Sequence, residues 1–385
     1  MRYLLFITIF FSIILKLNGQ TNEEKNIKPD ELALRIKSIS FIKNNEYFNP
    51  ISSSKFVMAS SRPLFADKSK WIEGYTLIGF FFQPELIYSP SSRVIIRAGM
   101  HLLKYSGEDK FSITRPVFST TLFFSENTSL TLGTLPGADR HGLFDPHFNS
   151  ERMYSNYAED GFQLLSTNDH IFTDTWLSWE NYIFKGTSER EIFTFGESFL
   201  YKSMPLAGFL SFEVPIQFQF KHYGGQITNY PEHVETFFNL ATGIRINFDI
   251  GEKRFGQAGI EYSYFRNSVI PDRPYTIISH GNASWFGLNY NFRSITLRSS
   301  YWKGHDFYAP NGNPIYASIM DFQSDYAIHS RRVLSNSVFL KILPESFLEL
   351  LLGVETYYDM CQKRMDHSIT LHLNFDKLLR LAVLN

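Results

Sequence analysis

The side chains best able to do chemistry gather in one stretch, Pro136 to Glu159, where acids, bases and histidines are mixed with aromatic residues. His141, Asp145 and His147 are ligand types that zinc accepts, but their spacing matches no defined zinc motif. We therefore interpret them as hydrogen-bonded loop residues and predict no metal and no other cofactor. The charged side chains that this stretch offers to a ligand are Asp139, Arg140, His141, Asp145, His147, Glu151 and Arg152.

A second candidate for chemistry is the sequence SHGNAS at 279–284, which brings His280 and Ser284 close together in the chain. A nucleophile must lie within hydrogen-bond distance of its base. Residues four apart on one strand are roughly 13 Å apart along its axis. The sequence also contains no glycine-rich phosphate loop, no paired catalytic carboxylates and no cysteine cluster. We therefore predict that the protein is not an enzyme.

Aromatic residues form a third group between residues 301 and 318. Stacking on sugar rings is one use of such side chains, and an aromatic belt at a membrane interface is another. We favour the belt for Tyr301 and Trp302. The aromatic residues in this group are Tyr301, Trp302, Phe307, Tyr308 and Tyr316.

The elements that position these residues have the period of β-strands. In AGFLSFEVPIQFQFKH, residues 207–222, apolar side chains occupy every even position from Leu210 to Phe220, opposite residues such as Glu213 and Gln217. Successive side chains of a strand point to opposite faces. About ten tilted residues are needed for a strand to cross a bilayer. The runs 93–103, 238–249, 256–264 and 369–376 alternate in the same way.

Short turns and longer connections alternate along the chain. The turns lie at 89–92, 125–128, 167–169, 204–207, 251–254, 292–294 and 344–346, and the longer connections include 136–159, 223–233 and 303–324. Outer-membrane barrels have tight turns at one end and long loops at the other. With a first strand near Lys55–Ser61, the pattern predicts an all-β, transmembrane, antiparallel, up-and-down β-barrel of about sixteen strands, with roughly fourteen to eighteen left open.

The two ends of the chain are expected to lie outside the barrel. Residues 1–19 resemble a secretory signal peptide, because Arg2 precedes an apolar run from Leu4 to Leu15. Residues 20–50 are predicted to form a periplasmic extension, and residues 51–377 the barrel. Residues 378–385 are either a tail or the end of the last strand. Both termini would then lie in the periplasm of a bacterium with an outer membrane.

Overall composition excludes some partners and favours others. A formal net charge of −1 gives no support for nucleic-acid binding, while aromatic residues make up 17% of the chain, as membrane girdles would require. The single cysteine, Cys361, cannot form an internal disulfide. We expect contact with outer-membrane lipid and with small hydrophilic solutes.

In its predicted architecture the chain resembles the general diffusion porins of Gram-negative bacteria, whose third loop folds into the barrel and narrows it. The resemblance implies that the charged residues of Pro136 to Glu159 form a constriction, facing charged side chains on the wall of the lumen. The candidate wall residues are Arg97, His101, Glu213, Lys221, Arg245, Glu261 and Arg298. Mixed charges of this kind predict a weakly selective pore.

The predicted function is passive diffusion of small hydrophilic solutes through this loop-narrowed lumen. The alternative is a non-conducting barrel whose external loops serve surface-polysaccharide assembly or a protein export machine. A homotrimer and a complex with another envelope protein are both left open. The two functions differ in whether the lumen conducts.

Overall fold

The computed structural model describes residues 27–48, 72, 74–137, 141–225, 227–230, 234–249, 251, 256–270, 277–320, 323–344 and 347–384. Strands dominate this part of the chain, and its helical segments are one short helix, α3, and one 3-10 turn, η2. No helix within these ranges is long and apolar enough to span a membrane. The elements in chain order are β1 (Glu31–Phe48), β2 (Tyr75–Ser91), β3 (Val94–Tyr105), β4 (Ile113–Ser125), β5 (Thr128–Thr134), α3 (Arg152–Ser155), β6 (Asp160–Thr167), β7 (Ile171–Asn181), β8 (Glu191–Lys202), β9 (Leu210–Gly224), β10 (Glu235–Asp249), β11 (Gln257–Ile270), β12 (His280–Phe292), β13 (Ile295–His305), η2 (Pro314–Tyr316), β14 (Ile319–Met320), β15 (Gln323–Ala327), β16 (Ser330–Pro344), β17 (Leu348–Asp359) and β18 (Arg364–Val383).

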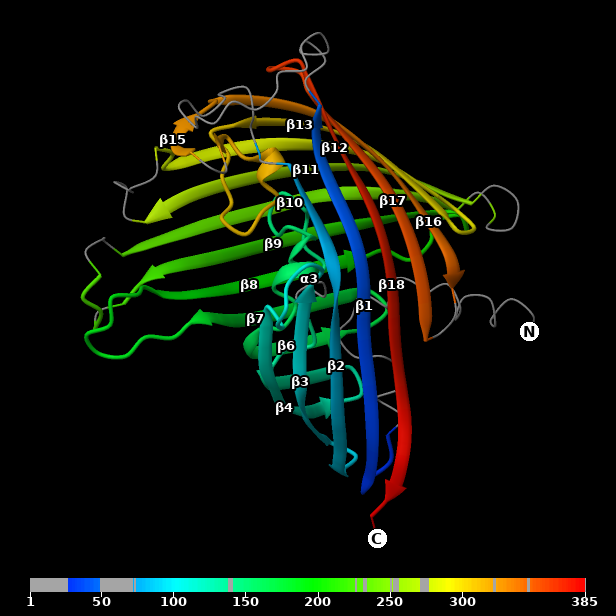
Figure 1. Cartoon of the computed structure of the whole chain (residues 1–385). Coiled ribbons are helices and arrows are strands. Elements are labelled where there is room, and N and C mark those ends of the chain that lie inside the picture. The colour runs from blue at the N-terminus through cyan, green and yellow to red at the C-terminus, as the bar shows by residue number, and fades with distance from the viewer. Residues whose placement is uncertain are drawn as a thin grey trace.

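Sixteen of these strands form one closed antiparallel barrel, in which β1 pairs with both β2 and β18 (Figure 1). The short strands β14 and β15 pair only with each other. Closure of the barrel leaves no free strand edge. A sheet surrounded by lipid requires such closure, because the bilayer core offers no hydrogen-bond partner to a free edge. The predicted fold class and strand number are confirmed.

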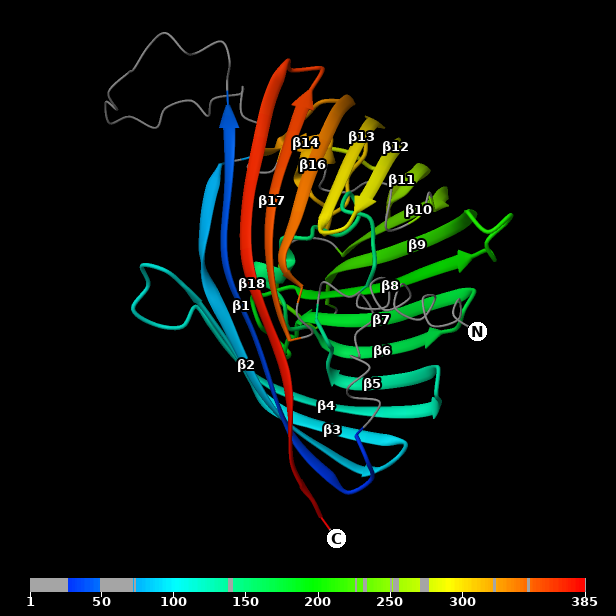
Figure 2. The ribbon, with the colours of Figure 1, turned by 90° about the vertical axis from the view of Figure 1, so that its right-hand side faces the viewer.

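The two ends of the barrel differ in the length of their connections. At one end, the turn end, the connections are short, and β1 begins and β18 ends there, with Glu31 paired to Val383. At the other end, the loop end, longer segments such as 135–159 and 306–329 join the strands. Figure 2 shows β1, β2 and β18 side by side as long strands of the wall. The alternation of turns and loops inferred from the sequence is confirmed.

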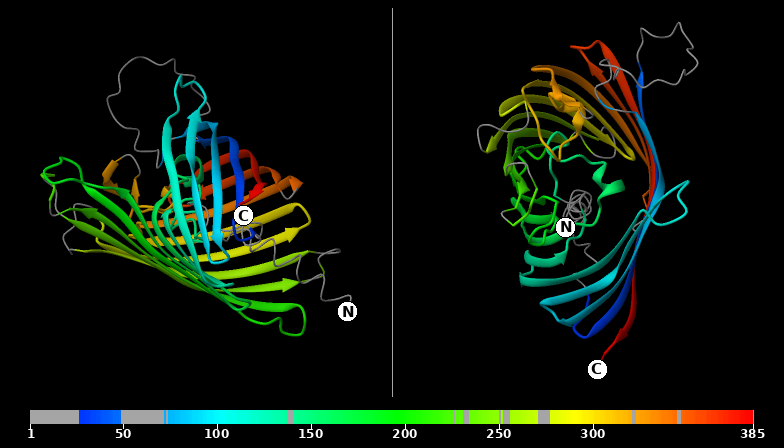
Figure 3. Two further views of the ribbon diagram at one scale, coloured as in Figure 1. Left: turned by 90° about the horizontal axis from the view of Figure 1, so that it is seen from below. Right: turned by 60° about the vertical axis from the view of Figure 1, so that its left-hand side comes forward.

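Most inward positions of the strands carry polar residues and most outward positions carry apolar ones, with exceptions such as the inward Phe265 and Trp302. In β9, Gln217 and Gln219 are buried on the inner face, while Ile216, the residue before Gln217, is 39% exposed on the outer face. This is the reverse of a soluble protein, because the outer face is built to meet lipid. The inner face is buried by segments of the chain that fold into the barrel, as Figure 3 shows from two directions.

The first strand does not lie where the sequence was expected to place it. Residues 31–48 form β1, so most of the predicted periplasmic extension belongs to the barrel. Its inward face carries buried charged residues, including Arg35, Lys37 and Lys43, which give the segment the composition of a solvated tail. The segment Lys55–Ser61 and the signal region 1–19 lie outside the described residues. The last strand continues to Val383, so residues 378–383 are the end of that strand.

Three apolar clusters fill part of the interior. One contains Trp302, Phe307 and Tyr316, which pack with Phe265 of β11. Trp302 is fully buried on the inner face, so its assignment to an interfacial belt is wrong. The reason is its register on β13, where it shares a face with Gly304, whereas Tyr301 points outward. This cluster attaches the 306–318 segment to the inner wall.

Candidate functional site

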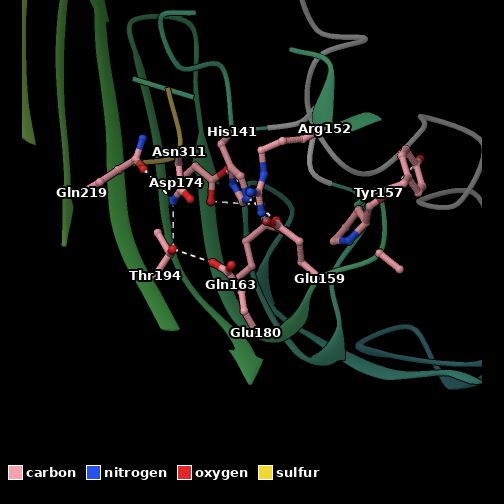
Figure 4. A network of polar contacts seen from close by, with 12 residues as sticks. His141, Arg152, Tyr157, Glu159, Gln163, Asp174, Glu180, Thr194, Gln219 and Asn311 are labelled. Carbon is pink, nitrogen blue, oxygen red and sulfur yellow. Dashed lines mark hydrogen bonds and ion pairs between the residues drawn. The ribbon is translucent and has the colours of Figure 1, made fainter. Parts of the chain in front are cut away.

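The segment 141–159, hereafter the inner loop, is fixed to the wall of the barrel by His141. The Nδ1 atom of His141 lies 3.0 Å from Oδ2 of Asp174 on β7, and its Nε2 atom lies 2.9 Å from Oε2 of Glu159 (Figure 4). The imidazole stacks on Trp176 with ring centroids 3.8 Å apart. Gly196 on β8 makes room for that indole, because a Cβ there would lie 2.4 Å from it.

The electrostatics of this anchor favour a charged histidine. Burial alone lowers the pKa of His141, but Asp174 and Glu159 together raise that pKa to about 9. Burial alone would raise the pKa of Glu159. The hydrogen bond and charge of His141 outweigh burial, so the pKa of Glu159 is lowered overall. Both groups are therefore ionised near neutral pH, and an imidazolium holds two buried carboxylates together.

Further contacts join the inner loop to β9. The Gln217 side chain accepts a hydrogen bond from the backbone N–H of Phe144 and donates one to the carbonyl of Gly142. Gln219 donates to the carbonyl of His147. The His147 ring is buried against Phe265 and Phe307, and burial lowers its pKa to about 3. His147 is therefore neutral, unlike His141.

A cavity of about 280 Å³ lies between the inner loop, the 306–318 segment and the strands β1, β2, β17 and β18. It lies in the half of the barrel near the loop end, because Lys43 and Asn45 are close to the end of β1. Its polar lining residues are Lys43, Asn45, Tyr75, Asn149, Glu151, Arg152, Asn311, Asn313, Tyr357, Asp366, His367 and Ser368.

Within this cavity, Glu151 is held by two neighbours on β1. The Lys43 ammonium lies 2.9 Å from the Glu151 carboxylate, and the Asn45 amide donates to the same oxygen at 3.0 Å. Lys43 also lies 3.6 Å from Glu355 of β17. Ser368 is the direct cross-strand partner of Asn45, and its buried hydroxyl has no hydrogen-bond partner in the described structure.

These groups together can carry out acid–base chemistry on a bound polar molecule. A fixed carboxylate can take a proton from water, and a positioned cation or amide can stabilise negative charge that develops on an oxygen. An unpaired buried hydroxyl is costly unless a ligand satisfies it. The cavity is therefore the best-equipped candidate site in the part of the chain that the structure describes.

The predicted loop residues fall at different places. Glu151 and Arg152 line the cavity, whereas His141 anchors the inner loop. Asp145 accepts hydrogen bonds from the Ser150 backbone and the Asn313 side chain, and so links the inner loop to the 306–318 segment. His147 is buried among aromatic rings, as described above. Asp139 and Arg140 lie outside the described residues.

The predicted wall residues are on inward-facing positions but do not form one ring around the inner loop. Arg245 lies between Glu213, at 2.7 Å, and Glu261, at 3.4 Å. Arg97 donates to Thr121 at 2.9 Å, and His101 is hydrogen-bonded to Gln83. The remaining two are Lys221, paired with Glu180, and Arg298, which lies over the ring of Phe339. A constriction formed by these residues stays a prediction.

The other chemical candidates from the sequence do not assemble. No cluster of three potential metal ligands occurs among the residues with described positions. His280 and Ser284 both lie on the outer face of β12, where His280 contacts Ser279 and Ser284 lies 3.5 Å from Tyr262. Neither residue lines the cavity.

Sequence reasoning missed several residues of the cavity and of the anchor. The sequence prediction assigns Lys43 and Asn45 to the periplasmic extension and does not include Asp174, Trp176 or Ser368. The strict alternation within β1, with Ile36 and Ile42 outside and Lys37 and Lys43 inside, is the signal that would have identified this strand. For Asp174, the signal is a carboxylate in the middle of a strand on the polar face.

Fold and interior together define the class of the molecule: it is a β-barrel of the outer-membrane porin type. OpdL of Pseudomonas aeruginosa is similar, with a TM-score of 0.50 and 10% identity over 91% of this chain and 99% of that one. OprD of the same organism has a TM-score of 0.50 and 9% identity over 92% of this chain and 96% of the other. At these identities the likeness shows the fold alone. A comparison with curated proteins finds no match.

The family follows from a different comparison. The model of the family described as Lipid A 3'-O-deacylase-type matches residues 22–383. The chain belongs to this family. Because the family is one of enzymes, the expectation that the protein is not an enzyme is wrong. A local sequence motif is not needed for such chemistry: the polar groups of the cavity, for example, come from β1, the inner loop and β18, which are far apart in the chain.

Proposed function

We propose that this protein is an outer-membrane ester hydrolase that removes an acyl chain from a lipid A-type glycolipid. The observation that carries the proposal is the family match over residues 22–383, since the family is named for the removal of an acyl group from lipid A. The cavity supports it, because a carboxylate, a cation, an amide and an unpaired hydroxyl meet there.

In the proposed reaction, water is added across the ester bond. The Glu151 carboxylate takes a proton from the attacking water, whose oxygen bonds to the ester carbonyl carbon. Lys43 and Asn45 hold Glu151 in place, and the Lys43 ammonium offsets the charge developing on the carbonyl oxygen. The proton returns to the departing sugar oxygen, giving a free fatty acid and a sugar hydroxyl. Ser368 donates its hydrogen bond to the bound substrate.

The proposal also requires an orientation in the membrane. We place the loop end outside and both termini in the periplasm, after export directed by residues 1–19. Bacterial barrels have long external loops and short periplasmic turns, which is the arrangement of this chain. The cavity then lies on the side of the outer leaflet.

Mass spectrometry of lipid A tests this function. Purified wild-type protein, refolded in detergent, is expected to release free fatty acid and to leave lipid A lighter by one acyl group. Glu151→Gln should lower the rate by about a hundredfold or more, the effect of losing a general base. The matched control is Glu213→Gln, which removes a paired carboxylate elsewhere in the lumen. Wild-type protein that releases no fatty acid, or an unchanged rate for Glu151→Gln, would refute the proposal.

The second candidate function is passive diffusion of small hydrophilic solutes. It is favoured by the inner loop, which packs inside the barrel as the porin resemblance implies. Single-channel recording in planar bilayers, with and without shortening of residues 136–159, tests it. Steady conductance that rises on shortening supports the channel. A silent protein whose folding is verified by heat-modifiable migration contradicts it and directs attention to a homotrimer or another envelope partner.

A further inference from the structure

Three exposed cations lie together on the outer wall near the loop end. They are Arg266 of β11, Lys303 of β13 and Arg332 of β16, and each has an outward side chain. In the barrel, β11, β12, β13 and β16 are consecutive neighbours, as Figure 2 shows. We refer to these three residues as the outer basic patch.

The strand register fixes their relative positions. Lys303 and Arg332 are direct cross-strand partners. Arg266 pairs with Asn282 of β12, which pairs with His305, two residues beyond Lys303. Because neighbouring strands lie about 4.8 Å apart, the three charges fall within a region that one phosphorylated headgroup can span.

Within the described residues, none of the three cations forms an ion pair with a carboxylate. Asp306, on the same rim, is engaged by His329 at 2.6 Å and by His305 at 3.5 Å. Arg332 interacts with the thiol of Cys361 and lies within electrostatic range of Asp359, whose carboxylate is already paired with Arg331 at 3.1 Å. Like charges directly opposite each other on neighbouring strands are unfavourable. An anion bound between Lys303 and Arg332 would remove that repulsion.

The patch lies at the height of lipid headgroups. On β11, Arg266 follows Tyr264 on the outer face, and on β13, Lys303 follows Tyr301. Outward tyrosines mark the interface between hydrocarbon and water. In both strands the cation lies two residues nearer the loop end than the tyrosine. The patch therefore lies just beyond the hydrocarbon.

We propose that the outer basic patch binds the phosphate groups of a glycolipid in the outer leaflet. The proposal rests on the loop end facing outward, as in the proposed function, and it adds a second lipid contact outside the lumen. Its consequence is that the barrel holds its own substrate class at the wall, near the loop end, which is also the half of the barrel that contains the cavity. Charge attraction is its physical basis, so binding should weaken as salt rises.

The test measures binding rather than turnover. Detergent-solubilised full-length protein is titrated with lipid A and with lipid A from which the phosphates have been removed, and bound lipid is counted by native mass spectrometry. We expect wild-type protein to bind the phosphorylated lipid, and the triple variant Arg266→Gln, Lys303→Gln, Arg332→Gln to bind it about tenfold or more weakly. The matched control replaces Lys104, Lys110 and Lys185 by Gln, which removes the same charge from other connections and strands at the loop end.

Two outcomes would overturn the proposal. One is equal binding of the two lipids by wild-type protein, and the other is an equal loss of affinity in the patch and control variants. Heat-modifiable migration verifies that each variant is folded. Because no ester has to be cleaved, a wild-type barrel without hydrolase activity still gives a result, so failure of the patch and failure of the proposed function are distinguishable.

Discussion

Replacing His141 by Gln should weaken the attachment of the inner loop and lower the stability of the barrel. Gln keeps a polar side chain of similar length but cannot carry the positive charge that faces Asp174 and Glu159. The pKa of His141 rises from 6.5 to about 9 on folding. At roughly 1.4 kcal/mol for each pKa unit, the charged form stabilises the folded state by about 3 kcal/mol. Loss of one partner from a buried ion pair costs a similar amount, about 3 to 5 kcal/mol.

The pH dependence of this effect has a defined sign. Because the folded-state pKa of His141 lies above its unfolded value, its stabilisation is complete below pH 6.5 and is lost as pH rises through about 9. Between pH 6 and pH 10.5, the difference in unfolding free energy between wild type and His141→Gln should therefore be largest at pH 6 to 6.5. It should shrink in alkaline solution, where the wild-type imidazole is neutral.

Urea unfolding in lipid vesicles, followed by tryptophan fluorescence, measures this difference between pH 6 and pH 10.5. His280→Gln is the control, since His280 is exposed on the outer face. A gap between wild type and His141→Gln that stays constant across this range would refute the imidazolium assignment. A double-mutant cycle with Asp174→Asn adds a second test, and a coupling energy near zero would contradict the ion pair.

Three further predictions concern single side chains. Burial lowers the pKa of His147 to about 3, so only the unfolded chain takes up this proton as pH falls below 6.5. His147→Phe should therefore reduce the loss of unfolding free energy between pH 7 and pH 4.5 by about 2 to 3 kcal/mol, and an unchanged loss would contradict this. Glu197 lies in mid-strand on the outer face, bonded to Thr175. Glu197→Leu should raise the unfolding free energy by about 1 kcal/mol, whereas a decrease would mean that this carboxyl is needed. Gly196→Ala should displace Trp176 and lower stability by about 1 to 3 kcal/mol, and equal urea midpoints would count against the stacked geometry.

Most of the wall could be predicted because lipid and lumen demand opposite side chains. In β9 every second residue is apolar, so both the strand and its outward face follow from the sequence alone. The turns follow for the same reason, since the alternation stops at each of them. The position of β1 could not be predicted in the same way, because its inward residues include Arg35, Lys37 and Lys43, and such charges are also typical of a solvated tail.

The interior could be predicted only in part. The length and charge of residues 136–159 identify this connection as a loop with candidate site residues. The contacts of the loop depend on strands far away in the chain. His141 is paired with Asp174, and Glu151 with Lys43, which lies more than a hundred residues earlier in the sequence. Such pairs are fixed by barrel closure and register. A single sequence, considered a few residues at a time, contains no signal for pairs of residues so far apart in the chain.

The way the inner loop is held bears on which function suits the barrel. A wide barrel of sixteen strands leaves room for water unless segments of its own chain enter it. Here Asp174 and His141 are almost fully buried, at 0% and 1% exposure, so the contact between loop and wall excludes water. Burying charges is costly, and the cost is offset only when the geometry is well fixed. A passive pore needs a wetted wall, whereas a hydrolase needs groups such as Glu151 held in one position. Since the same inner loop that His141 anchors also carries Glu151 into the cavity, its rigid attachment favours the proposed hydrolysis over the proposed diffusion.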